Sequence, residues 1–268
     1  MHVNGKLVES PGVMIVPNKD FVRVDDKLVT RRAEQFVYFA MHKPKGVITT
    51  LDDPAKRPTV MALLPAGVRT KVFPVGRLDL NSEGLLLFTN DGVLAHRLMH
   101  PGFKLPKVYI AKFRGVMTPD EFSKLTTGVR VDGRTLRADS AERLVSRSKH
   151  TWVRLVLTTG LYRQIRLMGR ATDHPVIKLK RIAIGPVMLG DLPIGKTRPL
   201  TEEEVELLRK LAARSAKPDG SRPAPQPGKG ALRGLRPARR TTLAKEIGLR
   251  HKPNPNKRKR GRGRRGAR

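Results

Sequence analysis

The sequence predicts an α+β fold with a mixed, largely antiparallel sheet. Short stretches whose polarity alternates from residue to residue, as in strands, outnumber the stretches with helical periodicity. The expected helices are interspersed among the strands without the regular strand–helix alternation of a parallel sheet. Hydrophobic residues make up 38% of the 268 residues, which is enough for a sizeable core.

The first 31 residues consist of short strand-like stretches around turns. Val3–Val8 and Phe21–Asp26 are the candidate strands, and Asn4-Gly5 and Asp25-Asp26 are turn pairs typical of hairpins. Few apolar residues are present, so this segment is not expected to be stable alone.

A larger domain is expected from residue 34 to residue 214. Thr59, Thr118 and Thr201 are placed to cap helices, and Thr201 with Glu204 forms the spacing of a capping box. Pro65 is expected to end the first of these helices, and Gly128 the second. The expected strands cover residues 36–41, 85–88, 107–113, 134–144, 151–158 and 176–184, and the expected helices cover 60–64, 92–99, 119–127, 162–170 and the residues after 201.

The composition changes after residue 214. Residues 215–268 contain 18 lysines and arginines but only 2 acidic residues, together with 7 prolines and 8 glycines. Such a segment buries too little apolar surface to offset the entropy lost on ordering. We expect a disordered basic tail.

The charge of the whole chain indicates a polyanionic partner. The 55 basic and 23 acidic residues give a formal net charge of +32, which favours nucleic acid. No long apolar run or basic amphipathic helix supports a membrane partner. The absence of cysteine excludes disulfides, thiolate catalysis and cysteine-ligated zinc, and no apolar signal segment begins the chain. We expect a cytoplasmic monomer.

One acid stands out in the loop between two strand-like stretches near residue 80. Asp79 follows Arg77 by two residues, and Gly76 and Gly84 bracket the loop. Loops held between rigid strands are frequent places for chemistry. On spacing alone, two interpretations stay open, namely a catalytic carboxylate and a carboxylate that caps a turn.

The stretch from Gly76 to Gly92, GRLDLNSEGLLLFTNDG, resembles the signature of the RsuA/RluB-type family of ribosomal RNA pseudouridine synthases. Three more stretches resemble motifs of that family in the same order: HKPKGV from residue 42, KVY from residue 107 and TGLYRQIRLM from residue 159. The resemblance covers about residues 1 to 200. It implies site-specific isomerisation of uridine to pseudouridine in ribosomal RNA, by flipping the base out of its stack and without a cofactor or metal. Large-subunit RNA is favoured, because long basic tails are commoner in that branch.

The resemblance also implies roles for individual residues. Asp79 is the catalytic residue, Tyr109 stacks on the flipped base and helps to remove its proton, and Arg166 pairs with Asp79 and keeps it ionised. Whether Asp79 adds covalently or takes a proton from the sugar stays open. The residues expected to bind substrate are Arg77, Arg163, Gln164, Leu179 and Lys43.

The chain departs from the family pattern in two places. Thr159 replaces the usual glutamate and Leu167 the second arginine, which concerns RNA contacts more than the chemistry. Residues 1–31 resemble only the C-terminal strands of an S4-like RNA-binding module. Either the start codon is misassigned or the module is degenerate. The expected organisation is therefore a partial S4-like module at 1–31, a catalytic domain at 34–214 and a tail at 215–268.

Other interpretations are weaker. Gly190–Thr197 fits the P-loop pattern, but Pro193 removes a backbone N–H from the loop that would cradle phosphate. His96 and His100 have the spacing of metal ligands on a helix but lack the accompanying glutamate, so no metal is expected. The remaining alternative is a non-catalytic ribosomal RNA-binding or ribosome-assembly protein, which replacement of Asp79 or Tyr109 would have favoured.

Overall fold

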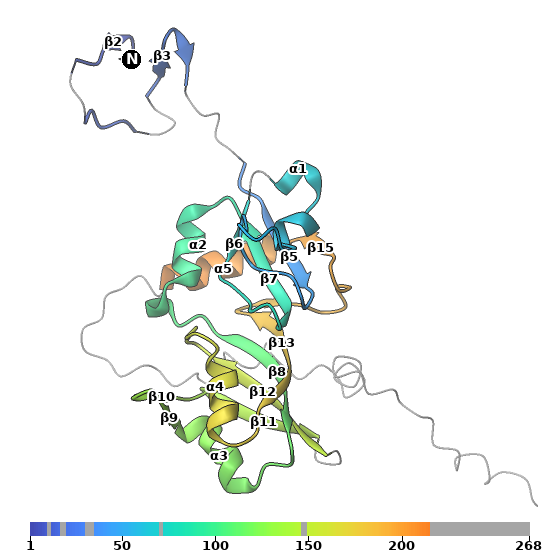
Figure 1. Ribbon diagram of the computed structural model, residues 1–268. Helices are drawn as coiled ribbons and strands as arrows, with labels where there is room; N and C mark the ends of the chain where they lie inside the picture. The colour runs from blue at the N-terminus through green and yellow to red at the C-terminus, as the bar shows by residue number, and fades with distance from the viewer. Residues whose placement is uncertain (10–11, 17–19, 30–34, 70–71, 146–148, 215–268) are drawn as a thin grey trace, which may run out of the picture. The chain divides into compact units, whose positions relative to one another are not determined.

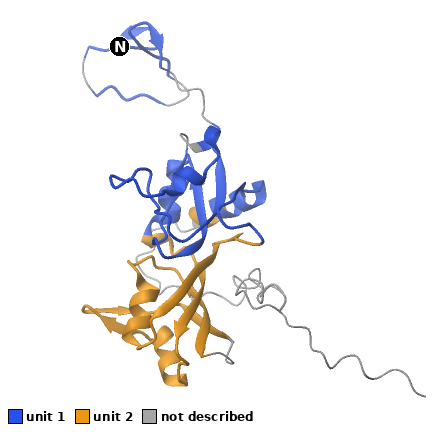
Figure 2. Cartoon of the chain, turned by 45° about the vertical axis from the view of Figure 1, so that its right-hand side comes forward, with its two compact units in different colours: residues 1–100, 191–209 blue, residues 101–190, 210–268 orange. Residues whose placement is uncertain are grey.

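The computed structural model describes residues 1–9, 12–16, 20–29, 35–69, 72–145 and 149–214, and the structural statements below concern these residues. Figure 1 labels the elements along the chain. The chain divides into two compact units (Figure 2). The first consists of Met1–His100 and Asp191–Arg209, and the second of Pro101–Gly190 and the residues from Lys210 onward. The predicted basic tail, residues 215–268, lies outside the described residues.

The N-terminal residues form a small four-stranded sheet. The turn residues Asn4 and Asp25 have φ angles of 51° and 49°, the left-handed conformation that tight hairpin turns require. Leu7 and Leu28 are 59% and 56% exposed, so this sheet buries little apolar surface. The predicted turns are confirmed, but the candidate strand Val3–Val8 is a hairpin of two short strands and the candidate strand Phe21–Asp26 is reduced to Val22–Val24. The relation to an S4-like module stays a prediction. The strand order is β2 (Lys6–Leu7), β1 (His2–Val3), β3 (Val22–Val24) and β4 (Lys27–Leu28).

The rest of the first unit is built around β5 (Tyr38–Lys43) and β7 (Glu83–Thr89), which pair antiparallel. The short strand β6 (Phe73–Val75) pairs with β7, and β15 (Thr197–Pro199) pairs with β5. Side chains from β5, β7 and the one-turn 3₁₀ helix η1 (Val60–Leu63) share one hydrophobic core. The remaining helices are α1 (Ala66–Arg69), α2 (Gly92–Met99) and the start of α5 (Glu202–Arg214).

The second unit has an antiparallel sheet with the strand order β11 (Ser140–Val145), β12 (His150–Leu157), β8 (Lys107–Arg114) and β13 (Val176–Ile184). β14 (Val187–Met188) pairs with β13, and the 3₁₀ turn η2 (Pro101–Phe103) precedes β8. Alternate residues of β8 enter two cores. Ala111 and Phe113 pack with side chains of α3 (Pro119–Thr127) and α4 (Gln164–Ala171) on one face, and Val108 and Ile110 pack with Trp152 on the other.

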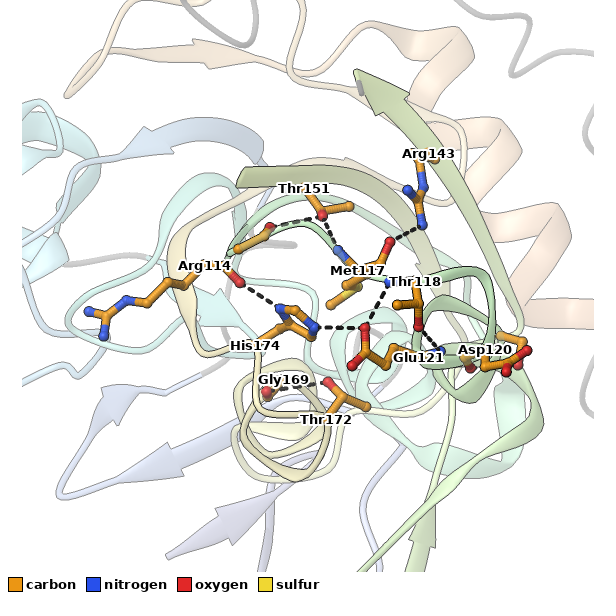
Figure 3. Close-up of polar contacts among 12 residues, drawn as sticks. Arg114, Met117, Thr118, Asp120, Glu121, Arg143, Thr151, Gly169, Thr172 and His174 are labelled. Carbon is orange, nitrogen blue, oxygen red and sulfur yellow. Dashed lines mark hydrogen bonds and ion pairs between the residues drawn. The ribbon is translucent and has the colours of Figure 1, made fainter. Parts of the chain in front are cut away.

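Local capping signals place two helices as the sequence predicts. Thr118 accepts a hydrogen bond from the Glu121 backbone, and the Glu121 carboxylate accepts one from the Thr118 backbone, which starts α3 (Figure 3). Thr201 and Glu204 form the same reciprocal pair at the start of α5. The predicted α+β class with a largely antiparallel sheet is confirmed.

Two details of the predicted elements are wrong, and some short strands were not predicted. Thr59 makes no side-chain cap, since the Ala62 amide that a cap would accept from bonds instead to the Thr59 backbone carbonyl at 3.2 Å. Residues 134–144 are not one strand but two, and the first of them, β10 (Arg134–Leu136), forms a hairpin with the unpredicted β9 (Val129–Val131). β14 and β15 were also not predicted, because each is too short to show a pattern.

Candidate active site

In the first unit, the loop between β6 and β7 carries Asp79. Gly76 begins the loop with φ +78°, a left-handed conformation that favours glycine. Leu78 is buried, and both of its backbone polar groups bond to the Thr49 hydroxyl, the amide at 3.3 Å and the carbonyl at 3.0 Å. The neighbouring Asp79 is half-buried, and its carbonyl closes a turn with the Ser82 amide at 3.0 Å. The backbone on both sides of the acid is therefore fixed.

Lys43 holds the same loop from inside the protein. Its side chain is 0% exposed, and its ammonium donates to the carbonyls of Pro44 at 2.9 Å, Asp79 at 3.2 Å and Ser82 at 2.9 Å. A buried ammonium is costly unless its donors are matched in this way. The structure thus brings Lys43 and Asp79 together, through the backbone of Asp79.

The other predicted residue of this unit, Arg77, lies exposed on the same loop. At the far end of the loop, Lys45 and Glu83 form an ion pair at 4.0 Å. The Gly46 amide bonds to the Leu80 carbonyl at 2.9 Å. The segment that follows β5 therefore supports the loop along its whole length.

In the second unit, Tyr109 and Leu179 belong to one packed cluster. Leu179 is a buried member of the core that α3 and α4 cover, and Tyr109 is half-buried against that core. In the pairing of β8 with β13, Leu179 lies opposite Ala111 and Arg181 lies opposite Tyr109. The structure therefore groups both predicted residues with α4.

The start of α4 carries the three remaining predicted residues. Arg163 takes a left-handed conformation with φ 48° just before the helix. The Gln164 side chain is 5% exposed, and its amide joins two partners, accepting from the Thr159 hydroxyl at 2.8 Å and donating to the Arg137 carbonyl at 2.8 Å. Arg166 is half-buried, and its Nη1 lies 3.4 Å from the Val176 carbonyl at the start of β13.

Two basic residues beside Tyr109 were not predicted. Lys107 lies two residues before Tyr109 on the same face of β8, and Arg181 is 3% exposed. Burial, followed by the charge of Arg181, lowers the pKa of Lys107 from 10.5 to about 8, against a smaller opposite effect of Asp139. The alternation of β8 could have indicated Lys107, whereas the position of Arg181 depends on strand pairing that no local pattern reveals.

The structure bears on the weaker interpretations too. The segment around Gly195 and Lys196 leads into strand β15 and bonds to His42 of β5, whereas a P-loop leads into a helix. Within the described part of the chain, no three histidine, aspartate or glutamate side chains are grouped as metal ligands. None of the helices described is both long and apolar enough to cross a membrane.

Comparisons with known proteins identify the family of the chain. A family model described as RNA pseudouridylate synthase matches residues 37–171. An uncharacterised RNA pseudouridine synthase of Aquifex aeolicus is 38% identical over 209 residues, which are 78% of this chain and 83% of that protein. The ribosomal large subunit pseudouridine synthase B of Bacillus subtilis is 38% identical over 212 residues, 78% of this chain and 85% of its own. A crystal structure of a pseudouridylate synthase superposes with a TM-score of 0.59 at 30% identity, covering 77% of this chain and 87% of that one. The chain belongs to the RNA pseudouridylate synthase family.

Proposed function

We propose that this enzyme isomerises uridine to pseudouridine at one or a few sites of ribosomal RNA, in the large subunit. Two relatives, from Bacillus subtilis and Pseudomonas aeruginosa, carry the name ribosomal large subunit pseudouridine synthase B. The net charge of +32 suits a large polyanionic substrate. The observation that carries the proposal is the half-buried residue Asp79 on a loop whose backbone is fixed on both sides.

The proposed chemistry needs few groups. The N1–C1′ bond breaks, the detached base turns, a C5–C1′ bond forms, and the proton on C5 is removed while N1 regains one. Bonds and protons balance without an oxidant or reductant. Asp79 acts on the sugar or the base, and Tyr109 stacks on the flipped ring and helps to take the C5 proton. Arg166 pairs with Asp79 in this scheme, and Leu179 lies beneath the uracil.

Two of the residues expected to bind substrate fit a supporting role better. Lys43 is enclosed and holds the catalytic loop through three carbonyls. Gln164 is also enclosed and uses both ends of its amide within the protein. We assign these two residues to positioning, and Arg77 and Arg163 to contact with RNA.

The organisation expected from the sequence belongs to the same proposal. The catalytic domain covers residues 34–214, preceded by a partial S4-like module at 1–31 and followed by the basic tail at 215–268. A monomer in the cytoplasm stays a prediction. The alternative of a non-catalytic RNA-binding protein has no observation in its favour beyond the basic charge.

Tritium release from C5-labelled uridine tests the proposal. The purified chain is incubated with transcribed large- and small-subunit ribosomal RNA and with assembly intermediates. We expect stoichiometric release from a large-subunit substrate and from at most a few uridines, which carbodiimide-based primer extension then locates. Release from small-subunit RNA alone would show that the substrate is small-subunit RNA and not large-subunit RNA. Binding without release on every RNA would favour the non-catalytic alternative.

A further inference from the structure

The β9–β10 hairpin presents a basic surface on a rigid base. Asp132 and Gly133 form its two-residue turn with φ angles of 48° and 74°. Val129 and Leu136 lie opposite each other in register and are buried in the core of the second unit. The apolar side of the hairpin, which includes the partly buried Val131, is therefore anchored, and the exposed residues of the hairpin can face a partner.

Three arginines lie on this hairpin and the residue after it, Arg130 on the side opposite the core and Arg134 next to the turn. Arg130, Arg134 and Arg137 are all exposed, and none forms an ion pair with another residue of the described ranges. One acid, Asp132, lies in the turn. The next acid along the chain, Asp139, has a carboxylate oxygen that accepts bonds from the Thr158 amide at 2.6 Å and hydroxyl at 3.0 Å. The hairpin therefore offers an excess of unneutralised positive charge.

An exposed aromatic residue stands on the loop before α4. Tyr162 is 77% exposed, whereas Tyr38 and Tyr109, the other tyrosines of the chain, are both half-buried. Its neighbour Leu161 is 45% exposed. An aromatic ring left in water next to basic side chains is the usual arrangement of a platform on which an unpaired base stacks.

The loop and the hairpin are joined by a buried side chain. Gln164 accepts from Thr159 at one end of the loop and donates to the carbonyl of Arg137 at the end of the hairpin, each at 2.8 Å. α4 also packs against β9, and Figure 1 shows the hairpin beside this helix. Tyr162 and the three arginines are therefore held on one framework.

We propose that the 159–163 loop and the β9–β10 hairpin form a docking surface for single-stranded RNA next to the target uridine. Tyr162 stacks on an unpaired base, and Arg130, Arg134 and Arg137 bind the phosphates beside it. This inference rests on the proposed function and adds the chemical form of RNA that the enzyme recognises. A protein partner fits less well, since the loop exposes two large apolar side chains, Leu161 and Tyr162, and specific protein interfaces need a larger area.

The test uses the full chain and a fluorescein-labelled transcript that supports turnover. Tyr162→Ala should weaken RNA binding roughly tenfold, the loss expected when one stacked base loses its aromatic platform. Tyr162→Ala should raise KM and leave kcat unchanged, and Tyr162→Phe should restore affinity. The same transcript annealed to a strand that pairs its flanking nucleotides should bind equally to wild type and Tyr162→Ala, because no unpaired base remains to stack.

The arginines are tested through salt dependence. Arg130→Gln with Arg134→Gln should lower the slope of log K against log salt by about 0.7 for each phosphate of single-stranded RNA that is no longer neutralised. Arg114→Gln is the matched control, because that arginine is exposed in the same unit and its side chain extends away from its neighbours in Figure 3. Its slope should equal that of wild type.

The outcomes separate this inference from the proposed function. Wild-type affinity and slope in both sets of variants, with normal tritium release by wild type, would overturn the docking surface alone. Loss of self-association in Tyr162→Ala, seen by sedimentation, would overturn it in favour of a contact between two copies of the chain. Absence of release by wild type contradicts the proposed function, while the binding comparison still decides whether this surface holds RNA.

Discussion

Nε2 of His174 lies 3.1 Å from Oε2 of Glu121, while Nδ1 of the same ring lies 2.6 Å from the Arg114 carbonyl (Figure 3). Both partners are acceptors, so both hydrogen bonds form together only when each ring nitrogen carries a hydrogen. The His174 ring thus ties three elements together: the first turn of α3, the end of β8, and the segment between α4 and β13. This tie fixes the far end of α4, the helix that carries Arg166 and that Arg163 precedes.

Replacing Glu121 with glutamine should destabilise the protein in a pH-dependent way. A hydrogen bond from the Thr118 backbone, then one from His174, lowers the pKa of Glu121 from 4.5 to about 2. A carboxyl whose pKa is lowered by folding stabilises the fold above pH 4.5 and loses that contribution as the pH falls toward 2. Glutamine keeps the capping box, so the comparison isolates the charge. Thermal midpoints of wild type and Glu121→Gln should differ most above pH 5 and converge toward pH 2, whereas a constant difference would contradict the lowered pKa of Glu121.

Gly169→Ala should destabilise the same region by overpacking. An added Cβ on this residue of α4 would lie 2.7 Å from the His174 carbonyl oxygen and 3.0 Å from the Phe113 ring. The backbone has to shift, at a cost of about 1–3 kcal/mol. Gly92→Ala is the matched control, because no atom lies within 4 Å of its added Cβ at the start of α2, and it should change stability by less than about 1 kcal/mol. Urea denaturation measures both, and equal stability of Gly169→Ala and wild type would show that the segment adapts.

Lys43→Met should slow the reaction without removing RNA binding. It deprives three carbonyls of their ammonium donor, so the loop that carries Asp79 loses its support. We expect kcat to fall about ten- to a hundredfold, which is about 1.4–2.8 kcal/mol of transition-state free energy. Hydrogen exchange should accelerate at the amides of Gly46 and Ser82, which bond to the loop.

Lys45→Met is the control for this variant, since Lys45 is 39% exposed and only faces Glu83 at the end of the loop. It should leave kcat and amide exchange near the wild-type values. If Lys43→Met instead weakened RNA affinity and left amide exchange and kcat unchanged, Lys43 would bind substrate as the sequence resemblance implies.

Deleting residues 215–268 should weaken RNA binding and reduce its salt dependence. The segment carries 18 basic and 2 acidic residues, half of the net charge of the chain. Each neutralised phosphate contributes about 0.7 to 0.9 to the salt slope, so the slope should fall by several units. A tail of equal length with glutamine and serine in place of the basic residues should behave like the deletion. Unchanged affinity would assign the tail another role, and a collapse of the melting temperature would show that it supports the fold.

Elements with local signals could be predicted from the sequence. Helix α3 is an example, because Thr118, Pro119, Glu121 and Gly128 each act on the backbone within a few residues. The β9–β10 hairpin was missed although Asp132-Gly133 is a hairpin turn pair, because the apolar residues around it are few and are stabilised by a core formed elsewhere in the chain. Local propensity therefore identifies helices better than it separates neighbouring strands.

The candidate site shows the same limit. The sequence locates Asp79 in a loop between strands, and the structure agrees. It does not reveal that Lys43, 36 residues earlier, reaches the carbonyl of Asp79 from the interior. Nor does it place Arg181 opposite Tyr109, because that neighbour is set by the register of two strands distant in sequence. The sequence shows which residue types are present, whereas the residues that contact one another become known only from the folded structure.

Asp79→Asn tests the central claim most directly. The substitution keeps the size and hydrogen-bonding shape of the side chain and removes the negative charge that the proposed chemistry needs. Glu83→Gln is the matched control, because it removes the same charge from the nearest acid along the chain, at the start of β7. Tritium release from C5-labelled ribosomal RNA is measured with filter binding in parallel. We predict that Asp79→Asn releases no detectable tritium while its RNA affinity changes less than tenfold, under about 1.4 kcal/mol, and that Glu83→Gln releases tritium as wild type does. Release by Asp79→Asn at the wild-type rate would contradict the assignment of catalysis to Asp79.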